Sequence, residues 1–315
     1  MLAPVCLFTY NRPHETRKTI EALQQNYLAL ESELFIFSDG PKNDTVVSKV
    51  NEVREFIRNV KGFKSVTFFE SKQNSGLSKS IIEGVSKVIE NFGKVIVLED
   101  DLITSPNFLD FMNQALNYYT EKSNIFSISG YGHKIKLPSG YEYDVLLRGR
   151  PYSWGWATWI DRWETVDWEI KDWDNFKNDR KQIKAFISHG SDLYGLLDAS
   201  MAGKISSWAI RFAYNQFKQQ KLTVCPYLSK IKNEGFDESA THCKTTYNRH
   251  KIFFDLTGKR VFNFTDELSL NHFINNQLVA YNNITSRIKS KILTFLIKKK
   301  IISNISEVEN VQILN

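Results

Sequence analysis

Cysteine is scarce in this sequence, and long apolar segments are absent. The chain has 315 residues but only three cysteines, Cys6, Cys225 and Cys243, which lie far apart and form no Cys-x-x-Cys pair. This spacing argues against a disulfide scaffold and a cysteine-based zinc site. No apolar stretch reaches the roughly 18 residues that a transmembrane helix needs, and residues 1–5 lack the pattern of a signal peptide. We therefore expect reduced thiols, a cytoplasmic protein and only peripheral contact with any membrane.

Two glycine-rich motifs that bind phosphate are also absent. No G-x-G-x-x-G follows the first predicted strand, at residues 5–9, and no G-x-x-x-x-G-K-[ST] occurs anywhere. Rossmann dehydrogenases and P-loop enzymes are therefore disfavoured. A sugar nucleotidyltransferase would carry a glycine-rich, lysine-bearing loop after that strand, whereas this chain has Tyr10-Asn11-Arg12-Pro13.

The composition is otherwise that of an ordinary globular protein. Hydrophobic residues make up 42% of the chain, which is enough for a large core. The formal net charge is +6, but the excess lies near the C-terminus, at Arg287, Lys289, Lys291 and residues 298–300. This distribution predicts a local basic surface and argues against a nucleic-acid-binding protein.

Apolar and amphipathic segments alternate along the first third of the chain. Strands are predicted at residues 5–9, 34–38, 66–69 and 95–98, and each of the first three is followed by apolar residues at helical spacing. This alternation predicts right-handed βαβ units. We expect an α/β, Rossmann-like fold with a mostly parallel central sheet flanked by helices, plus a C-terminal helical tail.

The fourth predicted strand runs directly into three carboxylates, Glu99, Asp100 and Asp101. A strand buried on both faces cannot hold three charges, so they must lie at its carboxyl end, the edge of an α/β sheet where ligands bind. Adjacent acids repel one another unless a cation or a ligand rich in hydrogen-bond donors lies among them, and hard oxygen ligands suit Mg²⁺ or Mn²⁺. The alternative is an acidic turn in which Asp101 caps a helix.

Arg12 and Asp39 follow the first and second strands, so they should meet these acids at the same edge. The combination would suit a nucleotide diphosphate with its metal. Arg12 would bind phosphate, Asp39 would accept a hydrogen bond from a base, and the acids would contact the ribose and the cation.

Six of the seven tryptophans fall between residues 154 and 173. Aromatic rings beside polar loops are surfaces on which sugar rings stack, and Gly155, between Trp154 and Trp156, permits a sharp turn. The alternative is a packed aromatic core, which we favour for the tryptophans at 159, 163 and 168.

In their order along residues 3–245, these motifs resemble those of nucleotide-sugar glycosyltransferases of the GT-A fold, and the chain looks like the bacterial family 2-like enzymes. The motifs are the Tyr-Asn-Arg-Pro loop, Ser38-Asp39-Gly40, Asn74-Ser75-Gly76-Leu77-Ser78, the acidic triplet and Trp154-Gly155-Trp156. The triplet resembles the Glu-Asp-Asp of animal N-acetylglucosaminyltransferase I. The resemblance implies a catalytic domain at 1–245, with a nucleotide-binding half at 1–101 and an acceptor-binding half at 102–245, and a C-terminal extension at 246–315.

The resemblance also implies roles for individual residues. Those expected to bind the nucleotide are Tyr10, Arg12, Asp39, Ser78 and Asp100, with Arg12 on the diphosphate, Asp39 on the uracil and Asp100 on the ribose or metal-bound water. Asp101 would hold the cation, Mn²⁺ or Mg²⁺, and His242 would lie near the metal or the diphosphate. The segment Trp154-Gly155-Trp156 would border the donor sugar and the acceptor.

One region departs from the family pattern. An inverting transferase needs a carboxylate to take the proton from the acceptor hydroxyl. Relatives place it just before a tryptophan-bearing helix, where this chain has Ser206 and Ser207. A serine cannot act as a base at neutral pH. Either Asp198 supplies the carboxylate, which we favour, or Asp237 or Glu238 does, or the chain is impaired in catalysis.

Residues 283–302 have a different pattern, with Ile284, Ile288, Ile292 and Phe295 at helical spacing among basic residues. A basic amphipathic helix of this kind suits the surface of an anionic membrane. The alternative is a helix packed on the catalytic domain or on a second subunit, which leaves oligomer formation open.

We therefore expect a metal-dependent, inverting hexosyl- or N-acetylhexosaminyltransferase. It would move a sugar from a nucleotide-sugar donor, expected to be a UDP-sugar, to a hydroxyl of a surface glycan or lipid-linked acceptor in polysaccharide biosynthesis. Its expected location is the cytoplasm, at the inner face of the cell membrane. Two alternatives stay open: a catalytically impaired binding protein of the same fold, and a sugar nucleotidyltransferase.

Overall fold

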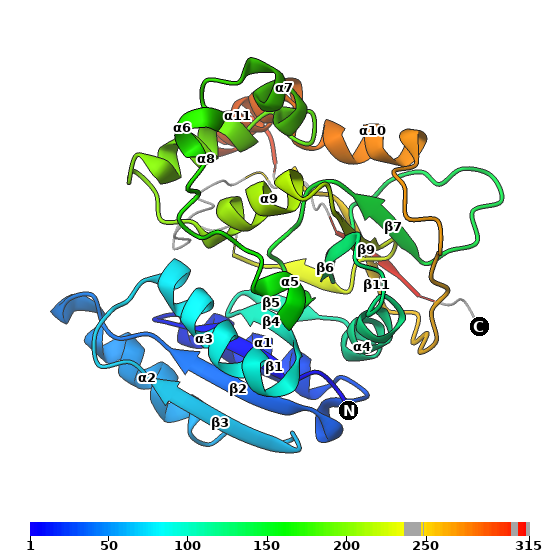
Figure 1. Ribbon diagram of the computed structural model, residues 1–315. Helices are drawn as coiled ribbons and strands as arrows, with labels where there is room; N and C mark the ends of the chain where they lie inside the picture. The colour runs from blue at the N-terminus through cyan, green and yellow to red at the C-terminus, as the bar shows by residue number, and fades with distance from the viewer. Residues whose placement is uncertain (236–246, 248, 304–307, 313–315) are drawn as a thin grey trace.

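The computed structural model describes residues 1–235, 247, 249–303 and 308–312. Its centre is an eight-stranded sheet with the strand order β3-β2-β1-β4-β8-β6-β9-β7 (Figure 1). In chain order these strands are β1 (Val5–Thr9), β2 (Glu33–Ser38), β3 (Ser65–Glu70), β4 (Lys94–Glu99), β6 (Ile125–Ser129), β7 (Val145–Arg148), β8 (Trp156–Trp159) and β9 (Leu222–Pro226).

Most neighbouring strands in this sheet are parallel. β1 pairs in parallel with β2 and β4, and β2 pairs in parallel with β3. β8 is antiparallel to both β4 and β6, β9 is parallel to β6, and β7 forms an antiparallel edge on β9. The predicted α/β fold with a mainly parallel sheet is confirmed. The carboxyl ends of β1, β2 and β4 consequently lie at one edge.

Alternate side chains of β1 belong to two apolar layers on opposite faces of the sheet. Val5 and Leu7 pack with one set of helices, and Cys6 and Phe8 pack with another. The first set is α1 (Pro13–Gln24), α2 (Val47–Ile57) and α4 (Phe108–Tyr118), and the second is α3 (Leu77–Phe92), α5 (Ile160–Trp163) and α9 (Trp208–Lys218). Because both faces are covered, all four apolar residues of β4 are fully buried, as the continuous apolar run predicted.

The remaining helices gather at the end of the molecule opposite β3 (Figure 1). They are α6 (Trp173–Phe176), α7 (Arg180–Ile187), α8 (Leu193–Met201), α10 (His272–Ala280) and α11 (Ile284–Lys298), and two short 3-10 turns lie elsewhere at Ala29–Glu31 and Asp44–Val46. Phe176, Phe186 and Leu197 form an apolar cluster with residues of α9. Within the described ranges, no helix combines the length and the apolar character that crossing a bilayer requires.

Two small sheets complete the fold. β5 (Leu102–Thr104), which follows the acidic triplet, pairs antiparallel with β10 (Ile231–Asn233), and β11 (Ile252–Asp255) pairs in parallel with β12 (Val308–Val311). The segment after β11 packs on α4, because the ring of Phe262 meets that of Phe111 edge to face at 5.3 Å. Part of the C-terminal extension is therefore built into the core.

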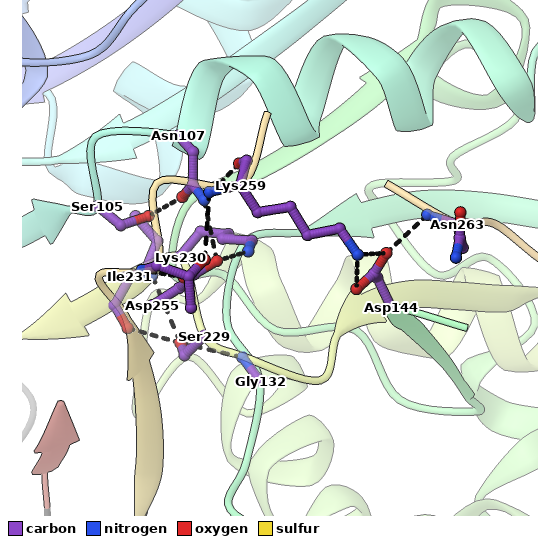
Figure 2. Close-up of polar contacts among 11 residues, drawn as sticks. Ser105, Asn107, Gly132, Asp144, Ser229, Lys230, Ile231, Asp255, Lys259 and Asn263 are labelled. Carbon is purple, nitrogen blue, oxygen red and sulfur yellow. Dashed lines mark hydrogen bonds and ion pairs between the residues drawn. The ribbon is translucent and has the colours of Figure 1, made fainter. Parts of the chain in front are cut away.

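A buried ion pair fixes this arrangement. Lys230 and Asp255 are in direct contact, with side chains only 3% and 1% exposed. Asn107 Nδ2 donates to Asp255 Oδ2 (3.0 Å), and Ser105 Oγ donates to the side-chain oxygen of Asn107 (2.8 Å) (Figure 2). Since Lys230 directly precedes β10, the network holds β10 against β5 and thereby against the acidic triplet.

Replacing Asp255 with asparagine should strongly destabilise the fold, because Lys230 would keep a buried charge without its counter-ion. Breaking a buried pair typically costs about 3–5 kcal/mol, which urea unfolding followed by tryptophan fluorescence would measure. Glu33→Gln is the matched control, since it breaks the solvent-accessible pair with Lys64 (2.8 Å), and surface pairs contribute less than about 1 kcal/mol. Equal small losses in both variants would contradict a structural role for the buried pair.

Candidate active site

The loops after β1 and β4 meet at the carboxyl edge of the sheet. The backbone N–H of Tyr10 donates to Asp100 Oδ2 (3.2 Å), and Arg12 Nη1 donates to Asp101 Oδ2 (2.9 Å). Both contacts follow from the parallel pairing of the two strands. The structure thus brings together four residues that the sequence placed in one site, while their ligands stay a prediction.

The acidic triplet carries more negative charge than its surroundings neutralise. Burial and, after it, the charge of Asp101 raise the pKa of Asp100 to about 7, against the opposing effect of Arg12. Burial also raises the pKa of Asp101 despite its contact with Arg12, and burial together with both aspartates raises the pKa of Glu99 well above its ordinary value. Arg12 offsets only part of this charge, so the site favours an added cation.

The charge fits a divalent cation that shares its ligands with a substrate. In the described part of the chain, no three histidine, cysteine, aspartate or glutamate side chains are grouped as a metal cage. Mg²⁺ commonly binds one or two carboxylates together with substrate phosphates, which needs no such cage. Asp101 and Asp100 are the carboxylates that could hold a cation in this mode. His242, which the sequence places near the metal or the diphosphate, lies outside the described residues.

Asp39 holds the loop between β3 and α3 in place. Its Oδ1 accepts from the backbone N–H groups of Gly40 (2.8 Å) and Ser75 (2.9 Å). Its Oδ2 accepts from the N–H of Gly76 (2.8 Å) and from Asn74 Nδ2 (3.0 Å). An ionised carboxylate has about four acceptor positions, so all of them are filled. The predicted hydrogen bond from uracil would have to replace one of these four.

Ser78 lies in the first turn of α3, which begins beside Asp39. The residue that caps this helix, Gly76, has a φ of 79°, a conformation that favours glycine. The first turn of a helix leaves backbone N–H groups unpaired and carries the positive end of the helix dipole. The half-buried Ser78 is therefore placed where an anionic ligand would be stabilised, and its contact with the nucleotide stays a prediction.

The chain after β10 packs against Asp101. The backbone N–H of Glu234 donates to the carbonyl of Asp101 (3.0 Å), and a Cβ at Gly235 would lie 2.0 Å from Asp101 Oδ2. Glu234 is also ion-paired with Lys18 (3.0 Å) and Lys232 (2.8 Å). Sequence reasoning missed these contacts because β10 is short and far along the chain, and the polar Asn233-Glu234-Gly235 loop was the only signal.

The two tryptophans of the Trp154-Gly155-Trp156 segment differ in burial. Trp156 is 2% exposed, and its ring stacks on those of Trp208 (4.7 Å) and Trp163 (5.8 Å). Trp156 is thus a core residue, contrary to its predicted place beside the donor sugar. Trp154 is half-buried and meets Tyr131 edge to face at 4.6 Å. Gly155, between them, has a φ of 59°, and a Cβ there would lie 2.7 Å from the side chain of Ile231.

Residues 5–161 match the sequence profile of glycosyl transferase family 2. The chain contains a glycosyl transferase family 2 domain. The matched residues run from β1 through β8, so the family 2 domain includes Arg12, Asp39, the acidic triplet and Trp154. No curated protein matches the chain.

Three solved structures resemble the chain at low sequence identity. The first is mannosyltransferase PcManGT from Pyrobaculum calidifontis in complex with GDP-Man and Mn²⁺, with 10% identity over 51% of this chain and 46% of that chain and a TM-score of 0.34. The second is TarS 1–349 from S. aureus, with 11% identity over 73% and 58% and a TM-score of 0.41. The third is apo UDP-glucose pyrophosphorylase, with 11% identity over 74% and 92% and a TM-score of 0.35. The chain thus spans about half the length of the first two.

The candidate bases follow the matched family 2 domain in the sequence. Asp198 is exposed on α8, and no hydrogen bond or ion pair joins its side chain to another described residue. Asp237 and Glu238 lie outside the described residues. Ser207 is the N-cap of α9, where its Oγ accepts from the backbone N–H of Ile210 (3.4 Å). Serine is a preferred N-cap residue, so helix capping accounts for this serine.

Gly235→Ala should disturb the candidate site of the family 2 domain more than the fold. The added Cβ would displace the carboxylate of Asp101 or the segment after β10, and the affinity for Mn²⁺ with UDP should fall roughly 10- to 100-fold, as for other changes around metal ligands. Isothermal titration calorimetry would measure this loss. Gly195→Ala is the control, because a Cβ at that position on α8 meets no atom within 4 Å. Normal binding by Gly235→Ala would mean that Asp101 does not hold the ligand.

Proposed function

We propose that the chain is a metal-dependent glycosyltransferase that moves a sugar from a UDP-sugar to a hydroxyl of a surface glycan or a lipid-linked acceptor. The observation that carries the proposal is the contact between Arg12 and Asp101 at the carboxyl edge of a family 2 domain. A guanidinium and two carboxylates of raised pKa offer the charges that a diphosphate and its cation need.

The acceptor oxygen would attack the anomeric carbon from the face opposite the diphosphate, and the bond from that carbon to the diphosphate oxygen would break, which inverts the centre. Negative charge then develops on the leaving nucleoside diphosphate, where Arg12 would stabilise it. Burial lowers the pKa of Arg12, but the charges of Asp100 and Asp101 outweigh this effect and raise it, so the guanidinium stays charged. A divalent cation, when bound at Asp101, would supply further positive charge to the diphosphate.

The attacking hydroxyl must give its proton to a base. We assign this role to Asp198, whose exposed carboxylate makes no hydrogen bond or ion pair within the described ranges. A binding protein that has lost catalysis is the second candidate, and the capping serine at position 207 favours it, because no carboxylate stands there. Donor turnover separates the two, since a pure binder would cleave no UDP-sugar.

Asp101→Asn and Asp198→Asn should separate binding from chemistry. Asp101→Asn should abolish the metal-dependent heat of UDP binding in calorimetry, because the amide cannot replace a carboxylate on the cation. Asp198→Asn should bind normally but release UDP from a UDP-sugar about 100-fold more slowly, the size of effect typical of a lost base. Glu83→Gln, exposed on α3, should leave both measurements unchanged. Unchanged titration heat in Asp101→Asn would contradict the metal assignment, and unchanged turnover in Asp198→Asn would contradict the base assignment.

We also propose that α11 holds the enzyme at an anionic membrane surface. Ile284, Ile288, Ile292 and Phe295 form a stripe along this helix and are 53% to 61% exposed. Ser290 is the buried residue of the helix, and at 3.6 residues per turn it lies roughly 200° from the middle of the stripe. The helix therefore contacts the protein through the side that carries Ser290 and turns this apolar stripe outward.

The charge around the stripe favours a membrane over a second copy of the chain. Residues 271–303 contain no aspartate or glutamate, and six basic residues lie on and just after α11: Arg287, Lys289, Lys291, Lys298, Lys299 and Lys300. Two such helices would repel each other if their stripes met. An anionic bilayer would attract them, with about 1 kcal/mol for each basic residue near the surface.

The double variant Ile288→Glu and Ile292→Glu should lose binding to vesicles, because it places two acids in the stripe. Flotation of the full chain with phosphatidylcholine vesicles containing phosphatidylglycerol would measure this, and vesicles of phosphatidylcholine alone should bind less. Leu30→Glu, at an exposed apolar residue away from α11, should float like the unaltered chain. Flotation of the double variant equal to that of the unaltered chain would contradict the membrane proposal. It would also be contradicted if size-exclusion chromatography shows that the unaltered chain is a dimer and the double variant a monomer.

A further inference from the structure

A concentration of positive charge lies away from the contact between Arg12 and Asp101. Arg148 ends β7, the edge strand that is four places from β4 in the central sheet. At about 4.8 Å per strand, the two strands are roughly 19 Å apart across the sheet. The charge belongs to a different part of the molecule from the candidate active site.

Arg148 is buried without a counter-ion among the described residues. It is 3% exposed, and its Nε has no hydrogen-bond partner there. Its Nη1 lies 3.4 Å from Nδ1 of His133, and its guanidinium lies over the ring of Tyr152 at 3.9 Å. These neighbours orient the guanidinium but do not neutralise it.

Two further arginines lie near Arg148, His133 and Tyr152 and belong to the same cluster. The guanidinium of Arg150 lies 5.7 Å from the centre of the Tyr152 ring and forms a bidentate pair with Asp192 (2.7 and 3.0 Å). Arg249 Nε donates to the carbonyl of Tyr281 (3.0 Å). Among the described contacts, Asp192 pairs with Arg150, and no carboxylate pairs with Arg148 or Arg249, so the cluster retains an excess of positive charge.

The histidines of the cluster do not change this balance. Nε2 of His133 lies 3.2 Å from Nδ1 of His250. Burial, followed by the charges of the nearby arginines, lowers the pKa of both histidines well below the ordinary value. Both rings are therefore neutral, and the net charge comes from the arginines.

We propose that Arg148, Arg150 and Arg249 form an oxyanion site that binds a phosphate group of the acceptor. A buried charge is costly unless an opposite charge accompanies it, and a bound phosphate would supply that charge. The planar guanidinium donates two parallel hydrogen bonds to phosphate oxygens. That the phosphate belongs to the acceptor rests on the proposed transferase function, whereas the anion site itself does not.

Aromatic rings adjoin the arginines and narrow the class of ligand. The ring of Trp154 lies 6.0 Å from that of Tyr152 and 5.3 Å from that of His250. Tyr152 therefore lies next to both the arginines and the half-buried Trp154. A saccharide that carries a phosphate ester would place its sugar ring on Trp154 and its phosphate among the arginines. The proposed acceptor is accordingly a phosphate-bearing saccharide.

Titration of the full chain with inorganic phosphate tests the site. Arg148→Gln and Arg249→Gln should each weaken phosphate binding by roughly tenfold, the usual effect of losing a hydrogen bond to a charged group. Arg58→Gln, at an exposed arginine paired with Glu70 (2.6 Å), is the control and should change the affinity less than twofold. Arg249 is only half-buried, so its variant keeps the test open should Arg148→Gln fail to fold.

Arg12→Gln separates this site from the donor site. Phosphate binding that persists in Arg12→Gln and falls in Arg249→Gln supports the proposal. Binding that is lost in Arg12→Gln and unchanged in Arg148→Gln and Arg249→Gln overturns it. If the unaltered chain binds no UDP with Mn²⁺ but its phosphate affinity still depends on Arg249, the transferase proposal fails and the anion site stands.

Two further ligands distinguish the sources of the phosphate. Glycerol 3-phosphate represents a phosphate ester of a glycan, and a short polyprenyl phosphate in detergent micelles represents a lipid carrier. Tighter binding of either one than of inorganic phosphate, with the gain lost in Arg249→Gln, supports the site and identifies its source. If Arg249→Gln binds both ligands as tightly as the unaltered chain does, the result counts against the site.

Discussion

The ion pair between Lys230 and Asp255 is the constraint on which the candidate site depends. Two charges that are almost fully buried are stable only together. The carbonyl of Lys230 also accepts from the backbone N–H of Ser105 (2.9 Å), so the pair fixes the start of β10 beside β5. From there the chain reaches Asp101 through Glu234 and Gly235. The C-terminal segment that supplies Asp255 is thus part of the structure that positions the acids.

Among the residues that the structure describes, charges are incompletely balanced in two places on the central sheet, which carry opposite signs. At the end of β4, Arg12 does not return the pKa values of Asp100 and Asp101 to their ordinary range. At the end of β7, Asp192 does not balance three arginines. Each imbalance raises the free energy of the protein without its ligand. Binding of a ligand of opposite charge lowers that free energy. A cation at the first place and an anionic acceptor at the second would satisfy both.

Local patterns in the sequence predict the part of this arrangement that depends on strand order. Continuous apolar runs predicted β1 and β4, and the acids after β4 had to lie at the sheet edge because a buried strand cannot hold them. The antiparallel strand β8 was not predicted, since Trp156–Trp159 follows a glycine and reads as an aromatic loop. Its insertion beside β4 buries Trp156. Lys230 and Asp255 resemble surface residues in the sequence, because only tertiary packing brings them together.

The least predictable feature is how closely separate backbone segments approach one another at the site. A Cβ at Gly40 would lie 2.4 Å from the backbone carbon of Gln73, and one at Gly235 would lie 2.0 Å from Asp101 Oδ2. In each case the glycine leaves space that the neighbouring loop fills. Neither neighbour can be read from local sequence, because the loops come from different parts of the chain. The hydrogen bonds of Asp39 have the same origin: its carboxylate orients the next loop because Gly40 lets that loop come near. Geometry at this edge is therefore set by contacts between loops, on strands whose order the sequence does predict.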